Sequence, residues 1–275
     1  MPDVALLILA GVLLAAAAWP ALPWCLRHWR RERSRRRPFP AAWRAMLRRR
    51  MPFFERLPVE LRRQLERHVQ VLLAEKPFIG CAGLRVSDEM RVLVAAQAAL
   101  LLLNRPAGHF PNLREVLLYP GAFVVERAEP DAAGLVHEGR RVMAGESWRR
   151  GQVVLSWDDV LAGAADPADG RNVVIHEFAH QLDQQSGRAN GAPFLGRRDR
   201  YARWAAVLGA AFDDLRLRVA RGEPGVLDAY GAQDPAEFFA VASEAFFERA
   251  AALAAEQPAL YRELAGYYRV DPANW

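Results

Sequence analysis

The pentad His176-Glu177-Phe178-Ala179-His180 brings two histidines and a glutamate together in the pattern His-Glu-x-x-His. Positions four residues apart share one face of a helix, so a helical pentad would place the two imidazoles side by side. Two such imidazoles suit a tetrahedral zinc ion. The Glu177 carboxylate, next to the first histidine, could then take a proton from an attacking water molecule. The pattern predicts a zinc-dependent hydrolase, and a peptidase before other hydrolases.

The residues around this pentad are mostly apolar, which predicts a buried helix over residues 172–185. Two histidines and a glutamate on a buried helix carry a desolvation cost unless something compensates for it. A bound metal ion would do so. The alternative is a core helix without metal, whose polar groups are satisfied by hydrogen bonds or face a cleft.

A catalytic zinc usually takes three protein ligands and one water molecule, so a third ligand is needed. The third histidine of the metzincin pattern is absent, because position 186 is serine. A later predicted helix, residues 234–247, carries Glu237 and Glu244 on one face. Glu237 could instead close a capping box with Asp234. Spacing alone does not choose between the two glutamates as the third ligand.

Further segments of the chain carry a resemblance to a known family. They are residues 86–91, 95–98, 100–104, 118–125, 145–148, 154–160, 172–183, 228–230 and 234–241. Together they resemble the Mlc titration factor A family of zinc metallopeptidases, over residues 53 to 268. The enteric member of that family begins near the catalytic domain and is soluble, so the chain departs from it at its start.

The resemblance implies a gluzincin-like site. His176 and His180 would be metal ligands, Glu177 the general base, and Glu237 the third ligand, because it occupies the family's Asp-Pro-Ala-Glu position. The resemblance also places Tyr230 near the site, where its hydroxyl could donate to the oxyanion of a tetrahedral intermediate. A half-buried tyrosine that packs beside the later helix is the alternative. A transcriptional regulator is a possible partner through the family resemblance alone.

Positive charge is concentrated in one segment of this 275-residue chain, whose formal net charge is +5. Residues 27–50 are rich in arginine and contain the single acid Glu32, whereas the chain after residue 50 has more acids than bases. The main domain therefore shows no nucleic-acid signature, and no direct nucleic-acid binding is expected. The two cysteines, Cys25 and Cys81, form no Cys-x-x-Cys motif, so no disulfide framework is predicted.

An uncharged apolar segment, residues 4–26, precedes the arginines and is long enough to cross a bilayer as a helix. The arginines after it place its C-terminal side in the cytoplasm. A cleaved signal peptide would need basic residues at its start, which this chain lacks; a buried or hairpin segment is a further alternative. We predict a single-pass anchor in the bacterial inner membrane (residues 1–26). A basic juxtamembrane linker (27–50) and a cytoplasmic catalytic domain (51–275) would follow.

The linker arginines could also bind anionic lipid headgroups, with a nucleic-acid arm as the alternative. Periodicity predicts the elements that position the site. Helices are expected at 57–74, 88–103, 172–185, 199–221, 234–249 and 256–268, strands at 115–119, 122–127 and 151–157, and a weak hairpin at 134–142. These elements predict an α+β, zincin-like fold, mainly helical with a small mixed sheet.

Two further residue assignments depend on this arrangement. Asp183 lies on the ligand face and could accept a hydrogen bond from a ligand imidazole, or it could be an exposed solubilising acid. Residues 153–155 could be the edge strand with which an extended peptide pairs.

The sequence thus predicts a zinc peptidase with one zinc ion per chain and a peptide or protein substrate. The resemblance favours aminopeptidase-like cleavage. The main alternative is a membrane-tethered protein that sequesters a transcriptional regulator, and a weaker one is a hydrolase of non-peptide amides.

Overall fold

The structure is a computed structural model that describes residues 29, 31–105, 108–130, 136–143, 145–148, 151–187 and 189–275. The chain divides into two units, Met1–Pro38 and Phe39–Trp275. In the first unit, residues 31–36 are helical. The segment predicted as a membrane anchor, residues 4–26, lies outside the described residues. Among the helices that are described, none combines the length and apolarity needed to cross a membrane.

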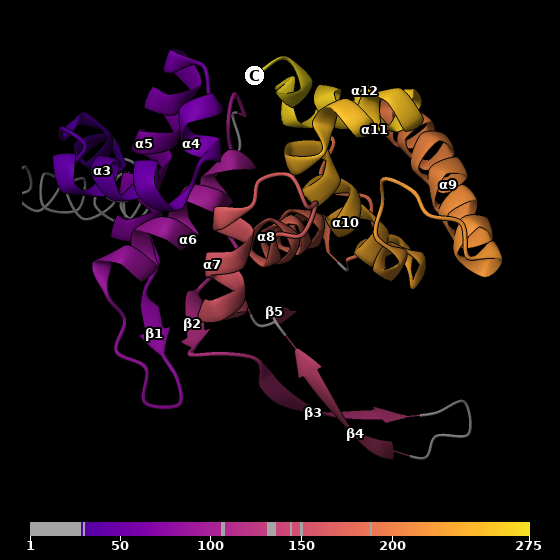
Figure 1. Ribbon diagram of the computed structural model, residues 1–275, viewed down its shortest axis with the longest axis horizontal. Coiled ribbons are helices and arrows are strands. Elements are labelled where there is room, and N and C mark those ends of the chain that lie inside the picture. Colours follow the sequence, from indigo (N-terminus) through magenta and orange to yellow (C-terminus); the bar gives the residue numbers. More distant parts are fainter. Residues whose placement is uncertain are drawn as a thin grey trace, which may run out of the picture. The chain divides into compact units, whose positions relative to one another are not determined.

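A four-stranded sheet lies in the second unit, with the strand order β1-β2-β6-β5 (Figure 1). Strands β1 (Phe78–Gly80), β2 (Glu115–Tyr119) and β6 (Gln152–Ser156) are parallel, and β5 (Gly145–Trp148) is antiparallel to β6. Residues 153–155 lie in β6, between β2 and β5, so the prediction that they form an edge strand is wrong. Their consecutive apolar side chains are all buried, as is typical of an interior parallel strand. The edge strands of this sheet are β1 and β5.

Strands β3 (Phe123–Pro130) and β4 (Val136–Met143) form a separate two-stranded antiparallel sheet. Val124 pairs with Val142 and Glu126 with Arg140. Figure 1 shows this hairpin extending away from the helices. The stretch 134–142, expected to form a weak hairpin, therefore supplies one strand, and its partner strand is β3.

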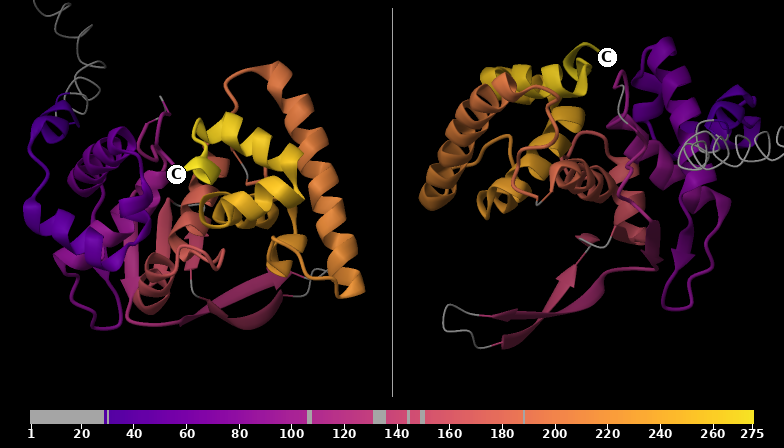
Figure 2. Two further views of the ribbon diagram at one scale, coloured as in Figure 1. Left: turned by 45° about the horizontal axis from the view of Figure 1, so that its top comes forward. Right: turned by 180° about the vertical axis from the view of Figure 1, so that it is seen from behind.

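Helices make up most of the second unit (Figures 1 and 2). They are α3 (Ala41–Arg50), α4 (Phe53–Arg56), α5 (Val59–Glu75), α6 (Asp88–Leu100), α7 (Trp157–Ala165), α8 (Val173–Asp183), α9 (Arg198–Arg221), α10 (Pro235–Glu248), α11 (Ala250–Glu256) and α12 (Pro258–Tyr268). Short 3-10 turns occur at Gln184–Ser186, Ala229–Ala232 and Pro272–Asn274. The predicted α+β fold, mainly helical with a small mixed sheet, is confirmed.

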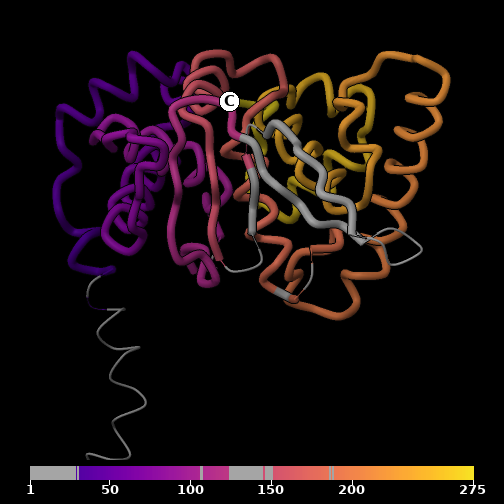
Figure 3. Tube along the Cα trace, turned by 90° about the horizontal axis from the view of Figure 1, so that it is seen from below, coloured from indigo at the N-terminus to yellow at the C-terminus, as the bar shows by residue number. Residues whose placement is uncertain are grey.

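The compact unit begins at Phe39 rather than at residue 51. Helix α3 lies within the stretch that was assigned to the basic linker, yet its Met46 and Leu47 are buried in the common core. Its arginines cluster in its last turn, where they complement the negative end of the helix dipole. Figure 3 shows helices α3 to α6 on one side of the sheet and the C-terminal helices α9 to α12 on the other.

Helices α8 and α10 pass through the core and carry the residues of interest. Helix α8 begins at Asn172, whose Oδ1 accepts a hydrogen bond of 3.0 Å from the Ile175 backbone N–H. Helix α10 begins behind Asp234, whose Oδ1 accepts from the backbone N–H groups of Ala236 and Glu237 at 2.8 and 3.0 Å. Its phenylalanines at 238, 239, 246 and 247 are fully buried, and each such side chain contributes about 1.5–3 kcal/mol. Caps and core together fix the helices against each other.

Candidate metal centre

Three side chains from α8 and α10 converge on one point. Oε2 of Glu237 lies 3.0 Å from Nε2 of His176 and 3.4 Å from Nε2 of His180. The possible ligand atoms of the three residues all lie within 4.8 Å of one another. Two atoms that bind one tetrahedral ion at about 2.1 Å are about 3.4 Å apart, so this spacing suits a shared metal ion. Within the described ranges, no second group of three or more potential ligands comes together in this way.

The charges in this cluster favour a cation. Burial alone would lower the pKa of His176, but hydrogen bonds to Glu237 and Glu244 raise the pKa well above its usual value. Burial would raise the pKa of Glu237, yet hydrogen bonds from His176 and His180 hold that pKa far below its usual value. The Glu237 carboxylate therefore stabilises positive charge on the imidazoles, and a metal ion that binds here competes with protons for the same nitrogen atoms.

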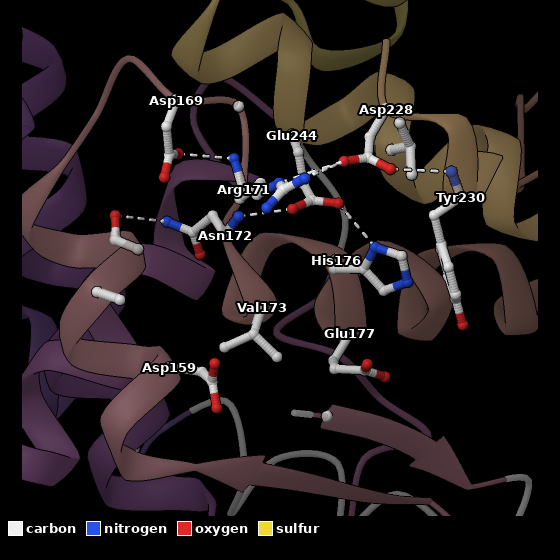
Figure 4. A pocket seen from close by; sticks show the side chains of 15 residues that line it. Asp159, Asp169, Arg171, Asn172, Val173, His176, Glu177, Asp228, Tyr230 and Glu244 are labelled. Carbon is white, nitrogen blue, oxygen red and sulfur yellow. Dashed lines mark hydrogen bonds and ion pairs between the residues drawn. The ribbon is translucent and has the colours of Figure 1, made fainter. Parts of the chain in front are cut away.

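Glu244 lies behind His176 rather than beside both imidazoles. Its Oε1 is 2.7 Å from Nδ1 of His176, and its Oε2 accepts a 2.5 Å hydrogen bond from the backbone N–H of Asn172 (Figure 4). A carboxylate on the second nitrogen of a histidine fixes the ring's orientation and tautomer. The two glutamates therefore occupy different positions: Glu237 faces both imidazoles, and Glu244 orients one of them. Glu237 does not close a capping box, because its carboxylate lies with the histidines.

A buried polar network extends this arrangement beyond the histidines. Nδ2 of Asn172 donates to Oε1 of Gln97 and to Oε1 of Glu248, both at 2.9 Å, and to the Gly163 carbonyl at 3.2 Å. Burial is the main reason that the pKa of Glu248 rises to about 9, and the charge of Glu244 adds to it. Sequence reasoning missed these residues. Two features of the sequence could have pointed to them. One is a lone glutamine in the apolar run of α6, and the other is the spacing of Glu248, one turn after Glu244.

Glu177 lies on the wall of the cavity beside His176 and is only 5% exposed. Strand β5 passes very close to it: a Cβ atom on Gly145 would lie 2.7 Å from Oε1 of Glu177 and 2.5 Å from Cγ2 of Val173. Any larger residue at position 145 would displace one of these side chains. Gly145 therefore lets the edge strand approach the helix and limits where the Glu177 carboxylate can lie.

Tyr230 lies beside His176 in the 3-10 turn Ala229–Ala232. The two ring centroids are 5.8 Å apart, with an interplanar angle of 58°. The turn is held by Asp228, whose Oδ1 accepts from the Tyr230 backbone N–H at 2.9 Å. The tyrosine ring is 40% exposed and lines the same cavity as Glu177, and Figure 4 shows its side chain running alongside His176.

Asp183, on the same helix as the histidines, has a structural role in the loop that follows. It is fully buried, so the alternative of an exposed acid is wrong. Its Oδ2 accepts from the backbone N–H groups of Asn190 and Gly191 at 2.8 and 2.7 Å. The loop folds back onto the end of α8, and the Asp183 carboxylate satisfies backbone groups of that loop.

A cavity of about 410 Å³ opens beside the cluster (Figure 4). His176, Glu177 and Tyr230 line one end, and the cavity continues along the first turn of α8 towards α7. Converging polar groups at one end of a cavity of this size are typical of an enzyme site. The geometry suits a reaction in which a metal ion, a carboxylate base and a tyrosine hydroxyl act on one substrate group.

Comparison with known proteins agrees with this geometry. The family model described as glucose-regulated metallo-peptidase M90 matches residues 26–269. Mlc titration factor A of Serratia proteamaculans is 39% identical over 206 residues, 73% of this chain and 77% of the relative. That of Yersinia enterocolitica is 36% identical over 237 residues, 84% of this chain and 86% of the relative. An uncharacterized protein of Synechocystis is 39% identical over 270 residues, 98% of this chain and 97% of the relative. The family resemblance inferred from the sequence is confirmed.

Proposed function

The chain belongs to the family of glucose-regulated metallo-peptidases, M90, and on that premise we propose that it is a zinc-dependent peptidase with a zincin-like fold and active site. The observation that carries the proposal is the convergence of His176, His180 and Glu237 at ligand spacing. Two imidazoles and one carboxylate are a donor set that zinc prefers in catalytic sites, with one coordination position left for water or substrate. We propose one zinc ion per chain.

A bound zinc ion would supply a Lewis acid that polarises the scissile carbonyl and makes an attacking water molecule more acidic. Glu177 would accept the proton of that water and pass it to the leaving amine. Glu244 would keep the His176 ring in the orientation that ligation requires. The Tyr230 hydroxyl would donate to the developing oxyanion, since its ring lies beside that of His176.

The test is the variant Glu177→Gln, which keeps the shape of the side chain and removes its basicity. We expect it to retain metal and to lose peptide hydrolysis by several orders of magnitude, because the general base is lost. Metal content is measured by elemental analysis, and hydrolysis on a peptide panel. If the variant cleaves the panel as fast as the wild type, Glu177 is not the base.

Substrate preference is a finer proposal. We propose aminopeptidase-like cleavage on the basis of the family resemblance, and amino-acid anilides with free and acetylated amino groups test it. Faster cleavage of the free amines supports this preference, whereas equal rates or faster cleavage of the acetylated substrates contradict it.

A regulator-binding function is the alternative proposal, because several relatives are called Mlc titration factor A. In that case the chain would bind a transcriptional regulator, and binding would not need hydrolysis. A complex that survives both chelation and Glu177→Gln favours this function. A complex lost in either case contradicts it, and the two functions can coexist.

We also propose that the apolar segment at residues 4–26 anchors the chain in the bacterial inner membrane, with the metal centre in the cytoplasm. The relative from Synechocystis matches 98% of this chain, so its match includes this segment. Fractionation of cells expressing the full chain, followed by protease treatment of spheroplasts, tests it. We expect the protein in the membrane fraction and protected from external protease; recovery in the soluble fraction overturns the anchor.

A further inference from the structure

The cavity beside His176 and Glu177 is lined by small residues and by further charged groups. The small residues in its lining are Gly145, Ala162, Gly163, Val173 and Val241. Figure 4 shows Asp159 of α7, Val173 and Glu177 along one side of it. With about 410 Å³, the cavity has the size of a small-molecule site and can accept a substrate side chain as long as that of lysine or arginine.

The charged groups in the lining differ in whether they already have a partner. Arg171 pairs with Asp228, since its Nη2 lies 2.9 Å from Oδ2 of that residue. Asp169 accepts a 2.8 Å hydrogen bond from the Arg171 backbone N–H through its Oδ1. The charge of Arg171 is therefore already matched within the cavity wall.

Among the described residues of this wall, Asp159 is the acid whose carboxylate has no hydrogen-bond or ion-pair partner. Its backbone N–H donates to Oγ of Ser156 at 3.3 Å, which caps α7. For its carboxylate, the described part of the chain supplies neither a hydrogen-bond donor nor a cation. The side chain is half-buried and lines the cavity that begins at the metal cluster. A carboxylate in such a place binds a cationic nitrogen strongly, because charge-assisted hydrogen bonds gain from reduced solvation.

We infer that Asp159 is a specificity-determining residue that binds a cationic nitrogen of the substrate inside this cavity. The nitrogen belongs either to a lysine or arginine side chain or to the free amino terminus of a peptide. The inference rests on the proposed peptidase function, and it adds the class of substrate that the site selects.

Asp159 also lies in the first turn of α7, where an acid stabilises the helix through the macrodipole. Asp158 offers a matched control, because it lies in the same turn and is exposed outside the cavity. A dipole role would make the two acids equivalent. A specificity role requires that only Asp159 affects the choice of substrate.

The experiment uses the full chain loaded with zinc, as wild type, Asp159→Asn, Asp159→Glu and Asp158→Asn. The substrates are alanine octapeptides that carry lysine, arginine, norleucine or glutamate at each position in turn, with free or acetylated amino termini. Cleavage is located by mass spectrometry. We expect the wild type to favour a cationic peptide over its neutral counterpart by on the order of 10-fold to 100-fold in kcat/KM.

In Asp159→Asn that ratio should fall to near one, while Asp159→Glu and Asp158→Asn keep it. A preference for lysine or arginine that tolerates acetylation assigns the cation to a side chain; a preference lost on acetylation assigns it to the amino terminus. If the wild type cleaves peptides without a cationic preference, or if the preference survives in Asp159→Asn, the inference is overturned while the peptidase function stands.

Binding gives a readout that does not need turnover. Dissociation constants of the lysine and norleucine peptides, and of the free and acetylated alanine peptides, are measured by calorimetry on zinc-loaded Glu177→Gln, with and without Asp159→Asn. Tighter binding of the cationic peptide that disappears with Asp159→Asn supports the inference. Equal dissociation constants within both pairs of peptides overturn the inference. This result counts even if no peptide is hydrolysed and the peptidase proposal itself fails.

Discussion

Glu237 and Glu244 are chemically identical, and only their neighbours give them different roles. Seven residues apart on α10, both face α8, and sequence spacing could not separate them. The structure places Glu237 within 3.4 Å of both imidazoles and Glu244 on the outer nitrogen of His176 alone. The distinction depends on where α8 crosses α10, which is a non-local property. The pentad itself was predictable, because the positions i and i+4 fix the relation of its two imidazoles.

This difference leads to a prediction at the scale of single residues. Glu237→Gln should abolish stoichiometric zinc binding, because a neutral amide replaces the charged ligand. Glu244→Gln should still bind zinc, but with an affinity about 10- to 100-fold lower, which is the usual cost of losing a partner that orients a ligand. Zinc affinity is measured by competition with a chelating dye. Equal affinities for the two variants would contradict the division of roles.

At the scale of elements, the first turn of α8 is the junction that holds the site together. Asn172 caps this helix and also contacts α6, α7 and α10 through its side chain. The cap was not singled out from sequence, although asparagine before an apolar helix is a standard start signal. Its contacts with Gln97 and Glu248 could not be predicted, because they join residues more than seventy positions apart. Local signals give the helix start but not its tertiary partners.

Glu248 in this junction gives a prediction about pH. Its pKa rises from 4.5 to about 9 in the folded protein, mainly through burial. A raised pKa means that the folded state keeps a proton which the unfolded chain releases above pH 4.5. The contribution of Glu248 to stability is therefore fully present below pH 4.5 and is lost as pH rises towards 9.

Glu248→Gln removes this titration and keeps both an acceptor for Asn172 and similar volume. Relative to the wild type, we expect the variant to gain stability with rising pH by about 1.4 kcal/mol per pH unit inside that window. Urea unfolding at several pH values between 5 and 8.5 measures the difference. Parallel curves for the two proteins would show that Glu248 does not stay protonated in the folded state.

At the scale of the whole molecule, the sequence predicted the long helices well and the sheet only in part. The expected helix at 199–221 is α9 (Arg198–Arg221), and the one at 234–249 is α10 (Pro235–Glu248). Helices α3, α4, α7 and α11 were missed: α3 lies in the arginine-rich stretch, and α7 starts directly after β6 at Trp157. The strand order could not be read from the sequence, because no local pattern encodes the pairing of the edge strand β5 with β6.

The metal centre joins α8 to α10 in the middle of the core, so metal binding should stabilise the entire fold. A ligand that binds the folded state alone adds about 2.7 kcal/mol when its free concentration is 100 times its Kd. For a domain of this size we expect Tm to rise by about 5–10 °C with zinc relative to a chelator.

The rise in Tm should shrink as pH falls, because the raised pKa of His176 lets protons compete with zinc. His180→Ala should abolish the shift, and Asp158→Asn should not change it. Identical melting curves with zinc and with chelator would mean that His176, His180 and Glu237 hold no metal, whatever their spacing.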